Sequence, residues 1–271
     1  MRINTTIVLT ATAMIAASAF AGDEEQYFLS DQNSAATFDI AEGQISWEVD
    51  GISQLFAQQF YFRRASDQSE LLVSTENLTL DGIFASDTNP FRDDSNDALA
   101  QLYSDGNGLQ IETIFTLRGG TDGSGRSDLA EQIVIRNLSN SSMTLSFFQF
   151  VDFDLGGDFA DDSGIIINGN TVRQSDDGFS ISETVVTPQP TLFQVDDQAV
   201  LSGMLNDGAI DDLNGQSSYN GDVAWAFQWN INLDAGEEFI ISKDKSIVPT
   251  PGSLALMGIA GLLTTTRRRR S

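Results

Sequence analysis

Apolar and polar residues alternate along much of the chain, and this pattern predicts β-strands because side chains of a strand point to opposite faces in turn. The longest alternating run covers residues 223–233. Its apolar face carries Val223, Trp225, Phe227, Trp229, Ile231 and Leu233, and alanine, glutamine and asparagine occupy the other face. Two shorter runs alternate similarly, one at Ile45, Trp47 and Val49, the other at Leu109, Ile111, Thr113, Phe115 and Leu117.

Two further stretches predict pairs of neighbouring strands. Residues 131–155 read as two paired central strands joined by a polar turn at 137–142. In the second of these, Leu145, Phe147 and Val151 face one way and Phe148 and Phe150 the other, which predicts a strand covered on both sides. A turn at 234–237 then leads to a strand over 238–242.

Turn signals separate these runs, and no segment between the two ends of the chain shows a helical period. Asn-Gly and Asp-Gly pairs recur, and such pairs suit hairpin turns. The glycine-rich segment from Gly119 to Gly125 has no lysine and no helix after it, so it also reads as a hairpin loop rather than a phosphate-binding loop. The predicted fold class is all-β, a large antiparallel β-sandwich formed as one domain.

The first 21 residues have the features of a secretory signal peptide. An apolar stretch over 3–17 follows Arg2, and small residues at Ala19 and Ala21 predict cleavage before Gly22. We therefore expect residues 1–21 to form a signal helix that is removed during export.

The last 24 residues combine a chain breaker, an apolar run and a basic cluster. Val248, Pro249, Thr250 and Pro251 precede an uncharged run, and the basic cluster consists of Arg267, Arg268, Arg269 and Arg270. A helix over 252–266 would be about 22 Å long, which is short of the roughly 30 Å hydrocarbon thickness. Consecutive arginines stay on the cytoplasmic side of a bilayer. The pattern predicts a short apolar helix that anchors the chain transiently in the membrane.

This tail resembles the PEP-CTERM sorting signal of bacterial exported proteins, with Thr250 where the family usually has glutamate. The resemblance covers residues 248–271 only. It implies an exosortase-type enzyme as processing partner, cleavage near Val248–Pro251, and sorting through the inner membrane to the cell surface or extracellular matrix. Hosts of this system typically make exopolysaccharide. The domain organisation is then a signal peptide at 1–21, a sandwich at 22–247 and a sorting signal at 248–271.

Composition restricts the chemistry of residues 22–247. Nine of the 14 basic residues and all 39 acidic residues lie there, which gives a net charge of −30. Such a field repels nucleic acid and attracts divalent cations, although solubility outside the cell alone accounts for an acidic surface. The chain has no cysteine and no histidine. Thiol nucleophiles, Ser-His-Asp triads and zinc sites are therefore excluded, and carboxylate chemistry such as glycoside cleavage remains open.

The sharpest candidate site is a Ca²⁺ site at Asp152, Asp154 and Asp158, because alternating carboxylates followed by a flexible loop supply oxygen ligands. The alternative is a solvated acidic loop. A second candidate is an aromatic platform for sugars at Trp47, Trp225 and Trp229, for which the alternative is the core. Arg63 and Arg64, beside Tyr61 and Phe62, either bind an anionic sugar or pair with carboxylates.

From the sequence we interpret the protein as an exported, non-enzymatic structural or interaction protein associated with exopolysaccharide. It then has no catalytic residues and no cofactor other than the candidate Ca²⁺, and its ligand-binding residues are unknown. The alternative is a carbohydrate-binding module or a carboxylate-dependent carbohydrate-active enzyme. A cleft with facing carboxylates would favour that alternative.

Overall fold

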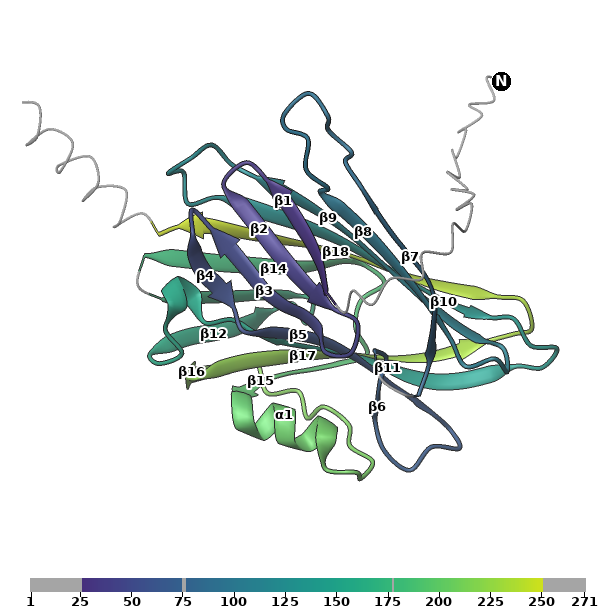
Figure 1. Ribbon diagram of the computed structural model, residues 1–271. Coiled ribbons are helices and arrows are strands. Elements are labelled where there is room, and N and C mark those ends of the chain that lie inside the picture. The colour runs from purple at the N-terminus through teal and green to yellow at the C-terminus, as the bar shows by residue number, and fades with distance from the viewer. Residues whose placement is uncertain (1–25, 75–76, 177, 251–271) are drawn as a thin grey trace, which may run out of the picture.

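The computed structural model describes residues 26–74, 77–176 and 178–250, and these residues form a sandwich of two antiparallel sheets (Figure 1). The predicted all-β sandwich is confirmed. The signal helix, Ala19, Ala21, Pro251, the apolar tail and Arg267 to Arg270 lie outside the described residues. Across the described ranges, no helix combines the length and the apolar character needed to cross a bilayer.

Sheet A has the strand order β1-β2-β3-β5-β11-β17-β15, with β4 beside β3 and β6 beside β5. Its strands are β1 (Gln26–Asp31), β2 (Ser34–Asp39), β3 (Gly43–Val49), β4 (Ile52–Leu55), β5 (Ala57–Arg64), β6 (Leu71–Leu72), β11 (Met143–Asp152), β15 (Leu192–Asp197) and β17 (Val223–Leu233).

Sheet B has the order β16-β12-β13-β14-β18-β10-β9-β8-β7. Its strands are β7 (Thr79–Ser86), β8 (Ala98–Ser104), β9 (Leu109–Gly119), β10 (Ser127–Asn137), β12 (Asp162–Ile167), β13 (Thr171–Asp176), β14 (Phe179–Thr187), β16 (Ser218–Gly221) and β18 (Glu238–Pro249). The segment from Gly119 to Gly125 connects β9 to β10 as the predicted hairpin loop.

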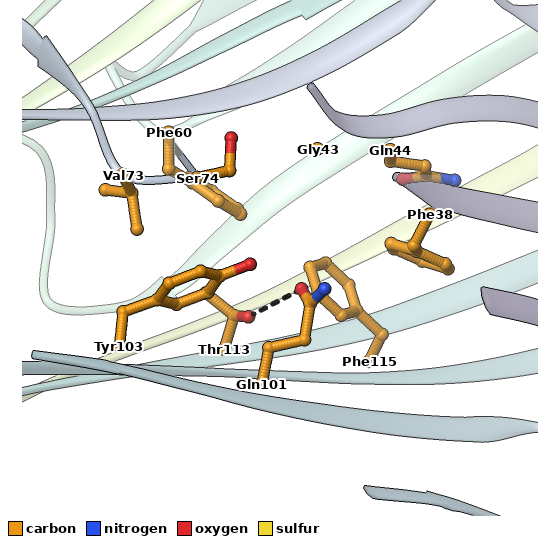
Figure 2. Close-up of a pocket in the computed structure, with 10 residues that line it drawn as sticks. All are labelled: Phe38, Gly43, Gln44, Phe60, Val73, Ser74, Gln101, Tyr103, Thr113 and Phe115. Carbon is orange, nitrogen blue, oxygen red and sulfur yellow. Dashed lines mark hydrogen bonds between the residues drawn. The ribbon is translucent and has the colours of Figure 1, made fainter. Parts of the chain in front are cut away.

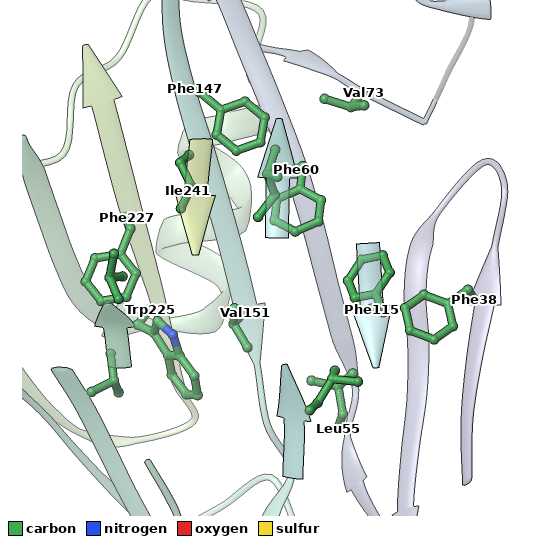
Figure 3. Close-up of a cluster of buried hydrophobic side chains, with 14 of the residues drawn as sticks. Phe38, Leu55, Phe60, Val73, Phe115, Phe147, Val151, Trp225, Phe227 and Ile241 are labelled. Carbon is green, nitrogen blue, oxygen red and sulfur yellow. The ribbon is translucent and has the colours of Figure 1, made fainter. Parts of the chain in front are cut away.

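The core lies between the two sheets, and the alternating runs supply it. Every residue on the predicted apolar face of β17 is at most 3% exposed. Rings from both sheets meet there: Phe60 of sheet A lies 6.3 Å from Phe115 of sheet B and 5.7 Å from Phe147, measured between ring centroids (Figure 3). Trp47, Trp225 and Trp229 are at most 1% exposed. These tryptophans therefore belong to the core, and the sugar platform is excluded at these positions.

The chain changes sheet at two turns that the sequence predicted to close pairs of neighbouring strands. β10 pairs with β9 and β18 in sheet B, whereas β11 pairs with β5 and β17 in sheet A. The predicted pairing of the strands around 137–142 was thus wrong, and the turn at 234–237 likewise carries the chain from sheet A to sheet B. Asn137 ties the two crossovers together, because its side-chain amide donates to the carbonyls of Ser141, Leu233 and Asp234.

A short helix, α1 (Gln198–Asn206), covers part of the outer face of sheet A, in a segment for which no helix was predicted (Figure 1). Asp197 caps its first turn by accepting from the Ala199 amide. Leu201 and Leu205, four residues apart, form a second apolar cluster with Phe148 and Phe150 of β11. The prediction that the strand at 143–152 is covered on both sides is therefore confirmed.

A bulge in β3 reverses the expected orientation of one residue. Thr37 pairs with Ser46 and Phe38 with Gln44, so Ile45 has no partner of its own in β2. Gln44 is consequently buried, whereas Ile45 turns toward the outer side of sheet A and does not share the buried face of Trp47.

The centre of the sandwich holds a buried group of charges, here called the ionic cluster, made up of Glu131, Glu183, Lys243 and Lys245. All four residues are at most 3% exposed. The Lys243 Nζ lies 2.5 Å and the Lys245 Nζ 2.6 Å from the two carboxylate oxygens of Glu131. Two glutamines of sheet A also contact the cluster, since Gln58 donates to Glu131 and Gln149 donates to Glu183. No prediction from the sequence covers this cluster.

Candidate functional site

A groove of about 540 Å³ lies on the outer side of sheet A, between the β3–β5 region and α1. This volume falls within the range of small-molecule sites. Its lining mixes an exposed aromatic ring, aliphatic groups, amides, hydroxyls and two carboxyl groups. The lining residues are Glu42, Ile45, Ser53, Leu55, Phe56, Ala57, Gln59, Phe150, Asp154, Gln198, Ser202 and Asn206.

Hydrogen bonds hold one wall of the groove in place. The Asn206 side-chain amide at the end of α1 donates to the Tyr61 hydroxyl at 3.0 Å, and that hydroxyl donates to the side-chain oxygen Oε1 of Gln59 at 2.7 Å. The Phe56 ring is 59% exposed, which is unusual for so large an apolar side chain in a lined cavity. The groove therefore offers an apolar surface next to polar groups in fixed positions.

Three aspartates from separate segments meet beside this groove, here called the aspartate cluster. Asp152 ends β11, Asp154 lies directly before the 3₁₀ turn η1 (Leu155–Gly157), and Asp222 joins β16 to β17. One carboxylate oxygen from each lies within 4.8 Å of the other two. The pairing of Asp152 with Ala224 explains the third member, because it places Asp222 beside the end of β11. Asp154 also lines the groove, so the cluster is open to it at that side chain.

Burial and like charge both act against ionisation of these groups. Asp152 is 2% exposed, and burial raises its pKa to about 8, with further contributions from Asp154, Asp222 and Asp162. The pKa of Asp154 and that of Asp222 are also raised, chiefly by burial. Asp162, on the neighbouring strand β12, is buried too, and its pKa rises to about 7. In the described part of the chain, none of the ion pairs between basic and acidic side chains includes a member of the aspartate cluster.

The structure brings together two of the three residues predicted for a Ca²⁺ site. Asp158 is exposed, and its carboxylate accepts from the Ala160 amide instead. Asp222 takes the third place and was not among the predicted ligands. The available signal was its position directly after the Asn220-Gly221 turn and before the strongest strand pattern. Nothing in the sequence said that this strand pairs with β11.

The remaining predicted residues lie elsewhere. Arg63 contacts Glu70 and Asp212, and Arg64 contacts Asp67 and Asp105, so the expected pairing with carboxylates is confirmed. Val248 and Pro249 belong to the last strand, β18, where Val248 pairs with Ser180 of β14.

The described residues also line two other hollows, which differ from the groove in size and shape. One, about 20 Å³ in volume and walled by Phe38, Phe60, Tyr103 and Phe115, is shown in Figure 2 with the hydrogen bond from Thr113 to Gln101. It has room for about one water molecule. The other is an open surface hollow of about 390 Å³ near Asp50, whose carboxylate accepts from two amides of the β9–β10 loop.

No protein-family model and no curated protein matches the sequence. Among solved structures, the chain is similar to a bacterial glucoamylase complexed with acarbose, with a TM-score of 0.57 and 9% identity over 90% of this chain and 36% of that one. It is also similar to the galactose mutarotase related enzyme of Lactobacillus acidophilus, with a TM-score of 0.50 and 8% identity over 83% and 97% of the two chains. The chain thus spans about a third of the glucoamylase.

These neighbours contradict the interpretation of a non-enzymatic structural or interaction protein. At such low sequence identity the two structures show the fold alone. That fold is a large sandwich, and both proteins that share it are named as enzymes that act on carbohydrates. The groove agrees with this correction, because a cleft that holds carboxyl groups was expected to favour the alternative, and Glu42 and Asp154 both line it. The sandwich fold is thus one that this chain shares with the galactose mutarotase related enzyme and with part of the glucoamylase.

Proposed function

We propose that this protein is an exported carbohydrate-active enzyme that binds a sugar in the groove and acts on it with carboxylate chemistry. The observation that carries the proposal is a groove of about 540 Å³ that combines an exposed aromatic ring with polar groups and reaches the aspartate cluster through Asp154. Sugars present apolar C–H faces and many hydroxyls, and this lining offers a partner for each.

Each part of the lining has a role in this proposal. The exposed ring of Phe56 stacks against a sugar face, and Gln59, Ser202 and Asn206 hydrogen bond to hydroxyls. Asp154 is the carboxyl group that meets the reacting end of the sugar. Because the chain has no histidine, proton transfer at the anomeric centre falls to carboxyl groups, as in the cleavage of glycosides.

The test uses the mature protein, neutral and acidic oligosaccharides, and two assays, for reducing-end release and for anomeric interconversion. We expect Asp154→Asn to lower kcat/KM at least 100-fold, because it removes a catalytic carboxyl group. Phe56→Ala is expected to raise the Kd for the sugar about fivefold, as loss of a stacked ring typically costs about 1 kcal/mol. The matched control is Asp158→Asn, an exposed aspartate four residues from Asp154, which should retain wild-type activity.

Turnover that survives Asp154→Asn would remove that residue from the mechanism. Absence of both turnover and binding across the panel would contradict the proposed function as a whole.

Export and sorting form the second part of the proposal and are supported by the two ends of the sequence. The protein enters the export pathway through residues 1–21 and is anchored transiently by its tail. An exosortase-type enzyme then releases it at the cell surface or into the matrix. Exopolysaccharide is in this view the nearest candidate substrate. The sorting enzyme needs an accessible stretch of chain at the point where it cuts.

Processing is predicted to remove the tail at or beyond the Thr250–Pro251 bond. Val248 and Pro249 are held in β18, and the Thr250 amide donates to the Gly178 carbonyl at 2.8 Å, so bonds before Thr250 are protected by the sheet. The intact mass of the secreted protein should correspond to a chain that begins at Gly22 and includes Thr250. Replacing Arg267 to Arg270 with serine should leave the tail uncut or the protein mislocalised. A secreted form that still carries the four arginines would contradict the sorting proposal.

A further inference from the structure

We propose that the aspartate cluster is a Ca²⁺ site, with Asp152, Asp154 and Asp222 as its protein ligands. This inference goes beyond the proposed function, because it concerns metal binding that does not require a sugar in the groove.

The spacing of the three carboxylates fits one ion of this size. Ca²⁺ binds oxygen ligands at 2.3–2.6 Å, so two ligands on opposite sides of the ion lie about 4.6–5.2 Å apart and adjacent ligands lie closer. In the aspartate cluster, the three oxygens lie within 4.8 Å of one another. The three oxygens are therefore close enough together to share one Ca²⁺. Mg²⁺ binds at 2.0–2.1 Å and demands a regular octahedron, which this spacing suits less well.

The state of Asp152 is a second observation that points to a ligand. Its side chain is buried at the end of β11, and its Oδ1 atom has no hydrogen-bond partner among the described residues. Buried carboxylate oxygens in proteins are otherwise almost always paired or bound to metals. The other two members bring more negative charge to the same place, and Asp162 adds to it. A divalent cation would satisfy the Oδ1 atom and balance the charge at once.

The chemistry of the ligands selects among metals. Every candidate ligand is a carboxylate oxygen, and the chain contains no cysteine or histidine that zinc or copper would favour. Hard oxygen ligands suit Ca²⁺, and extracellular Ca²⁺ modules bind with a Kd of about 10⁻⁴–10⁻³ M. The net negative charge of residues 22–247 also raises the local concentration of cations, which favours binding of Ca²⁺.

The ion would also connect the segments that form the groove. Asp152 and Asp154 belong to the β11–η1 junction, and Asp222 directly precedes β17. The Asp222 carbonyl accepts from the Gln198 amide at 3.0 Å, and Gln198 is the first residue of α1 and part of the groove lining. Ca²⁺ at this point would therefore fix Asp154 and the start of α1 relative to one another.

The experiment is calorimetric titration of CaCl₂ into the chelator-treated mature protein, with MgCl₂ titrated separately under the same conditions. We expect one Ca²⁺ per chain and at least tenfold weaker binding of Mg²⁺. Asp222→Asn should weaken Ca²⁺ binding at least tenfold, and Asp158→Asn, which removes only a nearby exposed charge, should weaken it much less. This pair of variants separates the ligand set seen in the structure from the one that the sequence suggested.

Thermal unfolding in the presence of chelator shows whether a variant that binds Ca²⁺ weakly is still folded. Asp222→Asn removes one of the negative charges that repel one another in the aspartate cluster. Its metal-free Tm should therefore equal or exceed that of the wild type. Its Tm should then rise less with added Ca²⁺. Equal affinity for both ions, absence of saturable Ca²⁺ binding, or equal losses in Asp158→Asn and Asp222→Asn would overturn the proposal. Sugar turnover is measured separately, so a failure of the metal site is distinguishable from a failure of the proposed function.

Discussion

Replacing Trp225 by alanine is expected to lower the free energy of unfolding by about 3–5 kcal/mol, as for other large buried aromatic residues. The side chain is fully buried in β17 and stacks on Phe153, with the ring centroids 5.5 Å apart. Its indole nitrogen donates to a carboxylate oxygen of Glu183 at 3.0 Å. The substitution thus opens a cavity and also removes one partner of the ionic cluster. Urea unfolding of the mature protein measures the change.

Two further variants calibrate this result. Phe147→Ala removes another fully buried ring and should cost a similar amount, whereas Phe84→Ala, at a ring that is 51% exposed on β7, should cost much less. If Trp225→Ala left stability unchanged and abolished binding of a polysaccharide, Trp225 would be part of a binding platform and the assignment to the core would be wrong.

The strands were predictable because burial of one face imposes a period of two, and Val223 to Leu233 shows that period without interruption. The partner of each strand was not predictable. The turns at 137–142 and 234–237 have the length and composition of hairpin turns, yet both carry the chain to the other sheet. A strand buries the same alternating side chains in the core whether the turn before it returns to the same sheet or leads to the other one. The alternating pattern alone therefore does not distinguish the two kinds of connection.

Local irregularities were missed for a related reason. The bulge at Ile45 inserts one residue into β3 and turns an apolar side chain outward, although the sequence still alternates there. The helix α1 is only nine residues long and contains Gly203, so two buried leucines are its main apolar signal. Both irregularities lie at the groove, and they shape its walls. The part of the fold that forms the candidate site was therefore the part least visible in the sequence.

Only part of the aspartate cluster was predictable from the sequence. Asp152 and Asp154 are close in sequence, and their alternation at a strand end was enough to suggest a site. Asp222 joins them only through the pairing of β11 with β17, which is a long-range property. The ionic cluster had a local signal that was overlooked, because Lys243 and Lys245 fall on the same face of the last strand as Ile241 and Ile247. Charged residues within an inward-facing apolar pattern indicate buried partners.

Removing one charge from the ionic cluster should have an effect as large as removing a core ring. In Glu131→Gln, Lys243 and Lys245 lose the carboxylate that contacts both of them, and Glu183 is the only acid of the cluster left to balance two buried lysines. Breaking a buried ion pair in this way typically costs about 3–5 kcal/mol. Glu238→Gln is the control, because that side chain is 52% exposed in its pair with Arg136 and should change stability by less than about 1 kcal/mol.

The pH dependence of this difference tests its cause. Burial alone would raise the pKa of Glu131, but the charges of Lys243 and Lys245 outweigh it and hold the pKa well below the usual 4.5. The folded state therefore binds a proton less readily than the unfolded state, so this contribution to stability is present above pH 4.5 and is lost as the pH falls below it. The gap in unfolding free energy between wild type and Glu131→Gln should be constant from pH 6 to 8 and shrink steadily below pH 4.5. Comparing the two proteins at each pH cancels the titration of the other acidic residues, including the aspartate cluster. A gap that stays the same down to pH 3 would show that the loss comes from packing around residue 131 and not from its charge.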